Sequence, residues 1–290
     1  MSTPLDQLPI RRLTRADVTI CADLSEDRGW PREEHKWGLL LAAGTGYGID
    51  DPSGKGLVTA CVVTRYGPRS GQHGELAAIG MVLVAERFGR QGVGRRLMEY
   101  VIAETGEIPL TLHATPTGQP LYEELGFGTV GRAEMVRGSF RLTGPAPQAL
   151  TRPATAEDLP AILRLDAEVF GQDRTHMITR LPAFADQLRV AESEGVLTGF
   201  AAAWPNMETH VVGPLIARDT DTAKSLIASL AAGSDRPLRT DIDVRHGELL
   251  DWVKSCGLST VAFNTVMLRG SGELPGAWSR RFAPLTVAAG

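Results

Sequence analysis

The spacing of hydrophobic residues along the first half of the chain predicts a sheet flanked by helices. Residues 55–66 and 74–84 are rich in Val, Ile, Leu and Ala, which predicts two paired strands. From Gly92 onward, apolar residues recur every three or four positions, which predicts an amphipathic helix that ends near Gly106. A further strand, a helix and one or two final strands are expected at residues 109–114, 118–125 and 128–140. The expected fold class is therefore mixed α/β.

The second half of the chain repeats features of the first half, which indicates a tandem duplication. Residues 12–17 and 152–158 open the two halves in the same style, and each leads into a helix. Each half also closes on a glycine turn followed by Met, a hydrophobic residue, Arg and Gly, at residues 126–138 and 257–270. Chance similarity is the alternative, because such turns are common. The duplication predicts two domains, at residues 1–141 and 149–290, joined by a Pro- and Gly-rich linker at residues 142–148.

Composition narrows the classes of function. A chain of 290 residues is long enough for two cores. A net charge of -4 gives no basic surface for nucleic acid or anionic membrane, and no apolar run is long enough to span a membrane. Cys21, Cys61 and Cys256 lie far apart, so we expect neither a zinc site nor a disulfide framework. These features predict a cytoplasmic protein without a nucleic-acid or membrane partner and without a metal.

A glycine-rich turn at residues 89–94 is the clearest candidate for chemistry. It follows a predicted strand and opens the helix that carries Arg95 and Arg96. Glycines allow close backbone approach, and the unpaired N–H groups at a helix start attract anions. The turn therefore suits a pyrophosphate, although a structural turn is the alternative. Neither the Walker pattern nor the G-x-G-x-x-G pattern of nucleotide-binding loops is present.

These residues resemble the GCN5-related N-acetyltransferases. In that family a strand is followed by Arg/Gln-x-x-Gly-x-Gly/Ala, and residues 84–94 match this layout except that Gly89 replaces Arg or Gln. The second family hallmark, an aromatic helix that ends in Leu-Gly-Phe, is matched by residues 121–127, so the resemblance covers about residues 8–140. It implies that acetyl-CoA is the acyl donor. The residues that it implies for acetyl-CoA binding are Leu83, Val84, Gly89, Arg90, Gln91, Gly92, Val93, Gly94 and Arg95.

The resemblance also implies roles in catalysis. Tyr122 corresponds to the tyrosine that protonates or hydrogen-bonds the departing thiolate, with packing in the helix as the alternative. Backbone N–H groups along Leu83 and Val84 are expected to bind the thioester oxygen. The family's strand glutamate falls at Ala78, which cannot accept a proton. Glu75, His73 and His113 are the remaining candidates for the base, unless the amine arrives already neutral.

The resemblance further implies that the acceptor pocket is built from the first two helices and late loops. Trp30 and Trp37 are candidates to line it, with core packing as the alternative. Arg174 in the second half is a candidate for substrate contact, with a surface position as the alternative.

The second half retains none of the predicted acyl-CoA chemistry. Its corresponding loop has Asp219 and Asp221 in place of glycines, and Val253 takes the position of Tyr122. This half resembles the C-terminal domain of tandem acetyltransferases related to holothin acyltransferase, which implies that it shapes the acceptor site. The expected function is acetyl transfer from acetyl-CoA to a small-molecule amine in a ternary complex. A non-catalytic acyl-CoA sensor or scaffold, or a protein amine acetyltransferase, is the alternative.

Overall fold

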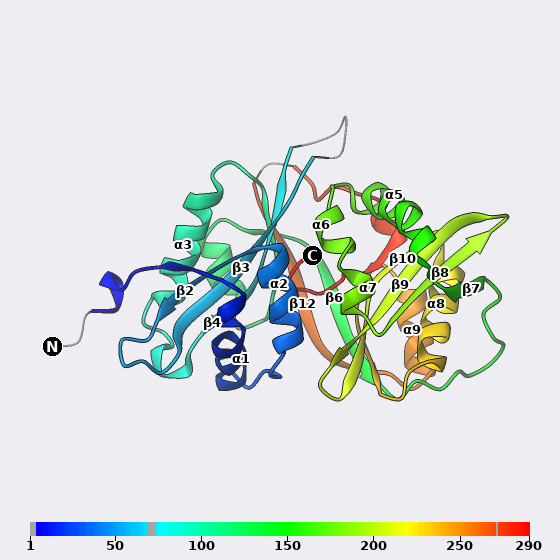
Figure 1. The fold of residues 1–290 in the computed structure, drawn as a ribbon, viewed down its shortest axis with the longest axis horizontal. Coiled ribbons are helices and arrows are strands. Elements are labelled where there is room, and N and C mark those ends of the chain that lie inside the picture. Colours follow the sequence, from blue (N-terminus) through cyan, green and yellow to red (C-terminus); the bar gives the residue numbers. More distant parts are fainter. Residues whose placement is uncertain (1–3, 69–73, 271) are drawn as a thin grey trace.

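The computed structural model describes residues 4–68, 74–270 and 272–290, and a single mixed sheet runs through both halves (Figure 1). The first half contains β1 (Arg11–Leu13), α1 (Val18–Asp27), α2 (Glu34–Ala43), β2 (Thr45–Asp50), β3 (Leu57–Tyr66), β4 (Leu76–Val84), α3 (Val93–Thr105), β5 (Leu110–Ala114), α4 (Gln119–Glu124) and β6 (Gly128–Gly138). The second half contains β7 (Leu150–Pro153), α5 (Leu159–Phe170), α6 (Thr175–Ile178), α7 (Leu181–Phe184), β8 (Gln187–Ser193), β9 (Val196–Asn206), β10 (Thr209–Ala217), α8 (Thr220–Ala232), β11 (Leu238–Asp243), α9 (Gly247–Ser255), β12 (Ser259–Arg269) and β13 (Arg281–Ala283).

The predicted strands and helices of the first half are confirmed, and their ends lie within two residues of the predicted ones. Residues 128–140, for which one or two strands were expected, form the single long strand β6. The mixed α/β class is also confirmed.

The order of strands in the sheet is symmetric about its centre. It reads β1-β2-β3-β4-β5-β12-β6-β11-β10-β9-β8-β7, and β13 lies outside this order and pairs with β10. The last strand of the first half, β6, therefore lies beside β11, and the last long strand of the second half, β12, lies beside β5. Thr265 of β12 lies opposite Ala114 of β5, and Asp241 of β11 lies opposite Met135 of β6. Neither half therefore completes its sheet from its own residues, although the two predicted domains are consecutive in sequence.

The internal repeat is visible in the details of the two halves. The N–H groups of Thr14 and Thr155 each donate to a carboxylate three residues later, Asp17 and Asp158, both at 2.7 Å. In both halves this capping box precedes the first long helix. It satisfies N–H groups that a helix start leaves without partners. The repeated sequence at residues 12–17 and 152–158 thus encodes the same local structure twice.

Helices cover both faces of the sheet. Three apolar clusters show which helices share a face: α3 and α4 pack on the β2 to β5 region, and α8 and α9 pack on the β9 to β11 region. Helices α1, α2, α5, α6 and α7 contribute to a third cluster on the opposite face.

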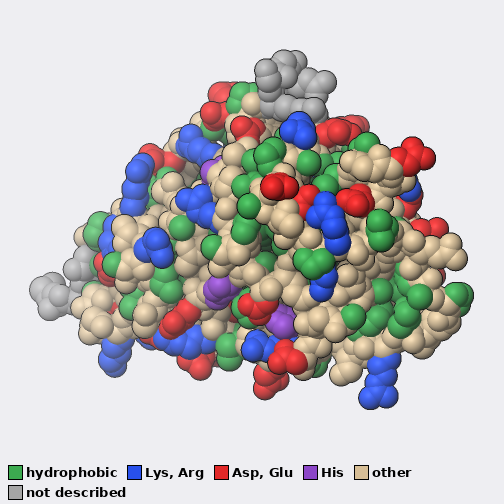
Figure 2. Space-filling view, turned by 45° about the vertical axis from the view of Figure 1, so that its right-hand side comes forward, with side chains coloured by type: hydrophobic (Ala, Val, Ile, Leu, Met, Phe, Trp, Pro, Cys, Tyr) green, Lys and Arg blue, Asp and Glu red, His purple; other side chains and the backbone are tan. Residues whose placement is uncertain are grey.

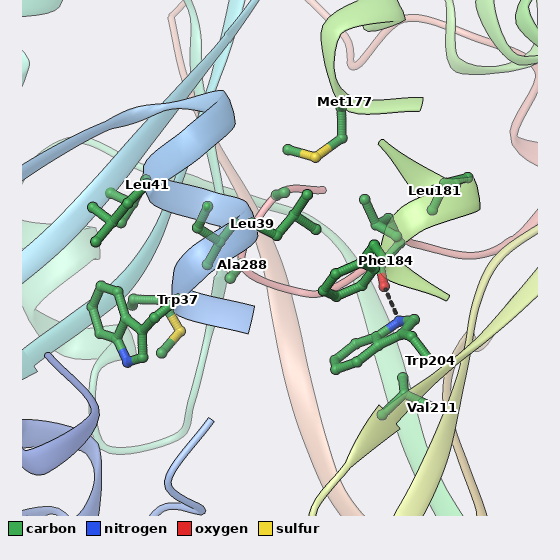
Figure 3. Packing of buried hydrophobic residues seen from close by; sticks show 14 of the residues in the cluster. Trp37, Leu39, Leu41, Met177, Leu181, Phe184, Trp204, Val211 and Ala288 are labelled. Atoms are coloured by element: carbon green, nitrogen blue, oxygen red, sulfur yellow. Dashed lines mark hydrogen bonds between the residues drawn. The ribbon is translucent and has the colours of Figure 1, made fainter. Parts of the chain in front are cut away.

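The third cluster joins the two halves through one shared core (Figure 3). Trp37 and Leu39 of α2 belong to the same cluster as Phe184 of α7 and Trp204 of β9, and Figure 3 shows these side chains on either side of the junction. Burial of apolar area is the dominant favourable term in folding. We therefore expect the halves to fold as one unit rather than as two separable domains.

The surface carries charges of both signs. Figure 2 shows acidic and basic side chains interspersed over one face. Within the described part of the chain, every helix is too short or too polar to cross a membrane.

Candidate active site

The loop before α3 forms a concave row of free N–H groups. Arg90 and Gly92 have φ angles of 59° and 79°, in the left-handed region, so successive amides turn toward the same side. The N–H groups of residues 91–95 make no hydrogen bond to any described residue, and the first helical bond runs from the Arg96 N–H to the Gly92 carbonyl. A Cβ atom at Gly92 would meet nothing within 4 Å, so there is open space beside the loop at this residue. This geometry fits an anion such as pyrophosphate.

Gly94 holds the start of α3 close to the end of β4. A Cβ atom there would lie 3.0 Å from Cγ2 of Val84. Gly89, the position that departs from the family pattern, has an ordinary φ of -59°, so its backbone conformation does not require glycine.

The arginines of α3 are placed differently from one another. Arg96 donates to the carbonyls of Leu5 and Leu8, at 3.0 and 2.6 Å, and thus ties down the N-terminal segment. Arg95 pairs with Glu124 at the surface. Both guanidinium groups are therefore engaged, that of Arg95 in an ion pair at the surface and that of Arg96 with the N-terminal segment.

Strands β4 and β5 separate beside this loop. They pair only from Ala77 to Ile79, while β4 continues to Val84. Met81, with a φ of 55°, marks the irregularity at which β4 turns away. Beyond Ile79 the edge of β4 that faces β5 is unpaired, which is where the backbone of Leu83 and Val84 was predicted to bind a thioester oxygen.

Tyr122 lies on α4, in the apolar cluster that covers the β2 to β5 region. Its ring packs edge-on against Phe127 at a centroid distance of 6.0 Å and is 8% exposed. Burial raises the pKa of its hydroxyl well above the usual range, with a smaller contribution from Cys61. The hydroxyl therefore keeps its proton at neutral pH and is available as a hydrogen-bond donor.

Among the three predicted bases, His113 is the one at the opening between the strands. It follows Leu112, the last residue of β5 that pairs with β4. Its Nδ1 lies 3.0 Å from the Val287 carbonyl, to which it can only donate, so Nε2 is the free acceptor. Burial lowers the pKa of the imidazole, which keeps it neutral. Glu75 is exposed before β4, and His73 lies outside the described residues.

Residues 284–290 form one wall of this opening. A Cβ atom at Gly80 would lie 2.2 Å from the carbonyl oxygen of Ala288, so only glycine permits the close approach of this segment to β4. The hydroxyl of Tyr66 donates to the Ala289 carbonyl. Through the Val287 carbonyl, this segment binds Nδ1 of His113 and leaves Nε2 free to accept a proton.

The equivalent opening in the second half is filled. Strand β10 pairs with β11 up to Val212, and β13 then pairs with β10 at Leu215 and Ile216. At the start of α8, Oδ1 of Asp219 accepts the N–H of Thr222 at 2.8 Å, so a carboxylate already occupies the anion position. Among the described residues, this half therefore lacks the open slot of the first half, and its helix start is already capped by a carboxylate.

The three predicted substrate contacts differ in their burial and in their partners. Trp37 is fully buried, and its Nε1 donates to Oγ of Ser25 at 2.9 Å, so it packs in the core. Trp30 is partly exposed on the loop between α1 and α2. Arg174 is 1% exposed, and two of its nitrogens donate to the Asp166 carboxylate at 2.7 and 2.8 Å. The alternative, a surface position for Arg174, is wrong, because this ion pair is enclosed.

Sequence reasoning missed the polar residues between the halves. Glu33, Asn206, Asp241 and Asn264 are buried there with atoms that lack partners. Only their tertiary neighbours distinguish these residues from ordinary surface residues.

Comparison with known proteins decides the family. A model described as an acetyltransferase (GNAT) domain matches residues 162–283, and a second model with the same description matches residues 69–143. The uncharacterized N-acetyltransferase YitH of Bacillus subtilis is 31% identical over 229 residues, which cover 77% of this chain and 78% of YitH. The chain belongs to the GNAT family. It is a tandem GNAT protein and an N-acetyltransferase, and acetyl-CoA is the acyl donor of this family in general.

Solved structures agree with the tandem GNAT fold. An acetyltransferase structure from Pyrococcus horikoshii has a TM-score of 0.80 at 18% identity and covers 100% of this chain and 98% of its own. A GCN5-related N-acetyltransferase from Sphaerobacter thermophilus has a TM-score of 0.61 at 17% identity, with 94% and 99% covered. At these identities the likeness concerns the fold alone.

Proposed function

We propose that the first half of this GNAT protein binds acetyl-CoA and transfers its acetyl group to the amine of a small molecule, while the second half shapes the acceptor site. The observation that carries this proposal is the contrast between the two halves. The free amides of residues 91–95 and the opening beside β4 are suited to pyrophosphate and pantetheine, whereas β13 and Asp219 fill the corresponding places in the second half. One acetyl-CoA per chain is therefore expected.

In the proposed reaction, the amine nitrogen attacks the thioester carbonyl carbon while both substrates are bound. The C–N bond forms, the C–S bond breaks, and the amine proton passes to Nε2 of His113. The free edge of β4 at Leu83 and Val84 donates to the oxygen as it gains charge. Fixing both substrates in one site contributes through positioning.

Tyr122 is assigned to the leaving group. Because its pKa is raised by burial, its hydroxyl is a weaker acid than a thiol, whose ordinary pKa is about 8.5. Donation of a hydrogen bond to the CoA thiolate is therefore favoured over full proton transfer, and the thiolate takes its proton from water. This refines the role that the family resemblance implied.

A thiol-release assay with acetyl-CoA and a panel of small amines tests the proposal. We expect amine-dependent release of CoA, and its loss in Gly92→Val, in which the added side chain strains the left-handed residue and enters the open space beside the loop. Tight acetyl-CoA binding without turnover of any amine would instead support a sensor or scaffold. Turnover of a peptide but of no small amine would support a protein acetyltransferase.

A further inference from the structure

Buried polar atoms without partners are concentrated between the two halves. Of the nine such side-chain atoms among the described residues, six belong to this one region. They are Oε1 of Glu33, Oδ1 of Asn206, Nε of Arg239, Oδ1 of Asp241, Oδ2 of Asp243 and Nδ2 of Asn264. Folded proteins leave few buried polar groups unpaired, and each one calls for an explanation. A concentration of them at one place points to a polar occupant.

These atoms form a continuous group. Arg239, Asp241 and Asp243 alternate along β11 and so lie on the same face of the sheet. Oε1 of Glu33, at the start of α2, is 4.0 Å from Nη1 of Arg239, which brings the first half against this face. Asn264 of β12 and Asp243 both lie opposite Ala133 of β6, one on each side of it.

A cavity of about 410 Å³ between the start of α2 and the end of β9 adjoins two members of this group, Glu33 and Asn206. Glu33 and Lys36 line it from the first half, and Trp204 and Asn206 line it from the second half. Its volume is in the range of small-molecule sites. On the sheet side, Asp243 of this group lines a separate, narrow cavity together with His113.

We propose that this region binds the acceptor, and that the acceptor is a polyfunctional amine of the amino-sugar or amino-acid type. Four of the six unpartnered atoms are acceptors and two are donors. A matching ligand must supply several N–H or O–H donors and at least one oxygen acceptor. Simple alkyl or aryl amines lack these groups. The proposal rests on the proposed function, because it names the substrate class of that reaction.

Charge does not dominate this recognition. Glu33 is neutralised by Lys36, which bonds to its other carboxylate oxygen, and Asp241 lies 3.4 Å from Arg239. Oδ2 of Asp243 accepts no hydrogen bond but lies 3.3 Å from Nη1 of Arg245, and Arg281 lines the narrow cavity beside it. With cations beside each carboxylate, the region selects by hydrogen bonds. A simple polycation such as an alkyl diamine is not the expected ligand.

Matched pairs of amines test the substrate class. Glucosamine is compared with cyclohexylamine, and serinamide with propylamine, so that each pair keeps a similar skeleton and differs in polar groups. A site built to hydrogen-bond a substrate rejects an analogue that lacks the groups, because its own buried atoms then stay unpaired. We expect kcat/KM at least tenfold higher for the polar member of one pair or both. Equal or better use of both apolar amines overturns the proposal.

Two variants test the location. Asn206→Leu removes hydrogen-bonding groups at similar volume in the second half, and should raise KM for the preferred amine at least tenfold without changing KM for acetyl-CoA. Glu33→Gln should act in the same direction, although it leaves Lys36 without its charged partner, so its melting temperature is measured in parallel. Glu208→Gln and Glu26→Gln make comparable changes at exposed side chains and serve as controls. An unchanged amine KM in a folded Asn206→Leu variant means that water satisfies these atoms, and the proposal fails.

A binding experiment separates this proposal from the proposed function. Calorimetry with glucosamine or serinamide in the presence of CoA requires no turnover. If no amine is acetylated but one of these probes binds and Asn206→Leu weakens it at least tenfold, the proposed function fails and the site stands. If amines are acetylated but neither probe binds and cyclohexylamine is preferred, the site fails and the proposed function stands.

Discussion

Replacement of Tyr122 by Phe should lower activity and leave stability unchanged or raised. The ring is 8% exposed and packs against Phe127, and Phe keeps these contacts. Only burial and a smaller influence of Cys61 shift the pKa of the hydroxyl, and no hydrogen bond contributes to the shift. Removing the hydroxyl therefore costs no hydrogen bond to a described residue, and we expect a melting temperature equal to that of the wild type or slightly higher.

The effect on turnover follows from the lost hydrogen bond to the thiolate. A hydrogen bond to a charged group contributes about 1.5–3 kcal/mol, and each 1.36 kcal/mol corresponds to a factor of ten in rate. The expected loss in kcat is therefore about 10- to 150-fold, with KM for acetyl-CoA nearly unchanged, because the interaction develops in the transition state.

The assay is steady-state thiol release, with a single-turnover measurement to establish that chemistry limits the rate. Tyr47→Phe is the matched control, because Tyr47 is buried in the same apolar cluster, on β2. It should keep wild-type kcat. Wild-type kcat in Tyr122→Phe with chemistry limiting would refute the assignment, and loss of acetyl-CoA binding would show a structural role instead.

Three further predictions concern the rest of the molecule. Calorimetry should find one acetyl-CoA site per chain and none in Gly92→Val, and two equivalent sites would contradict the reading of the second half. Because burial lowers the pKa of His113, kcat/KM should fall only as pH drops below the ordinary histidine range. His113→Gln should lower kcat about 100-fold and remove this decrease at acidic pH. An unchanged pH profile in His113→Gln would exclude His113 as the base. Arg174→Met should lower the free energy of unfolding by about 3–5 kcal/mol, measured with denaturant, because it leaves the buried Asp166 without its cation. Arg218→Ala, at an exposed ion pair, should change it little. Equal effects of the two substitutions would contradict the role of burial.

Local patterns in the sequence determined the elements and the phosphate loop. The apolar periodicity after Gly92 predicted α3, because a helix places every third or fourth residue on one face. The glycines at positions 92 and 94 predicted the loop, because positive φ and close approach are properties of single residues. The repeat at residues 12–17 and 152–158 predicted the duplication for the same reason, since a capping box spans only four residues.

Only the tertiary structure decided how the two halves combine. The exchange of β6 and β12 joins strands more than a hundred residues apart, and local propensity carries no information about such partners. The same holds for β13, whose three residues fill the second slot, and for Glu33 and Asn206, which meet at one cavity from opposite halves. Trp37 and Arg174 are candidates for substrate contact from their places in the sequence, and both are enclosed in the core. Whether such a side chain faces a ligand or is enclosed depends on long-range packing, which the order of residues along the chain does not reveal.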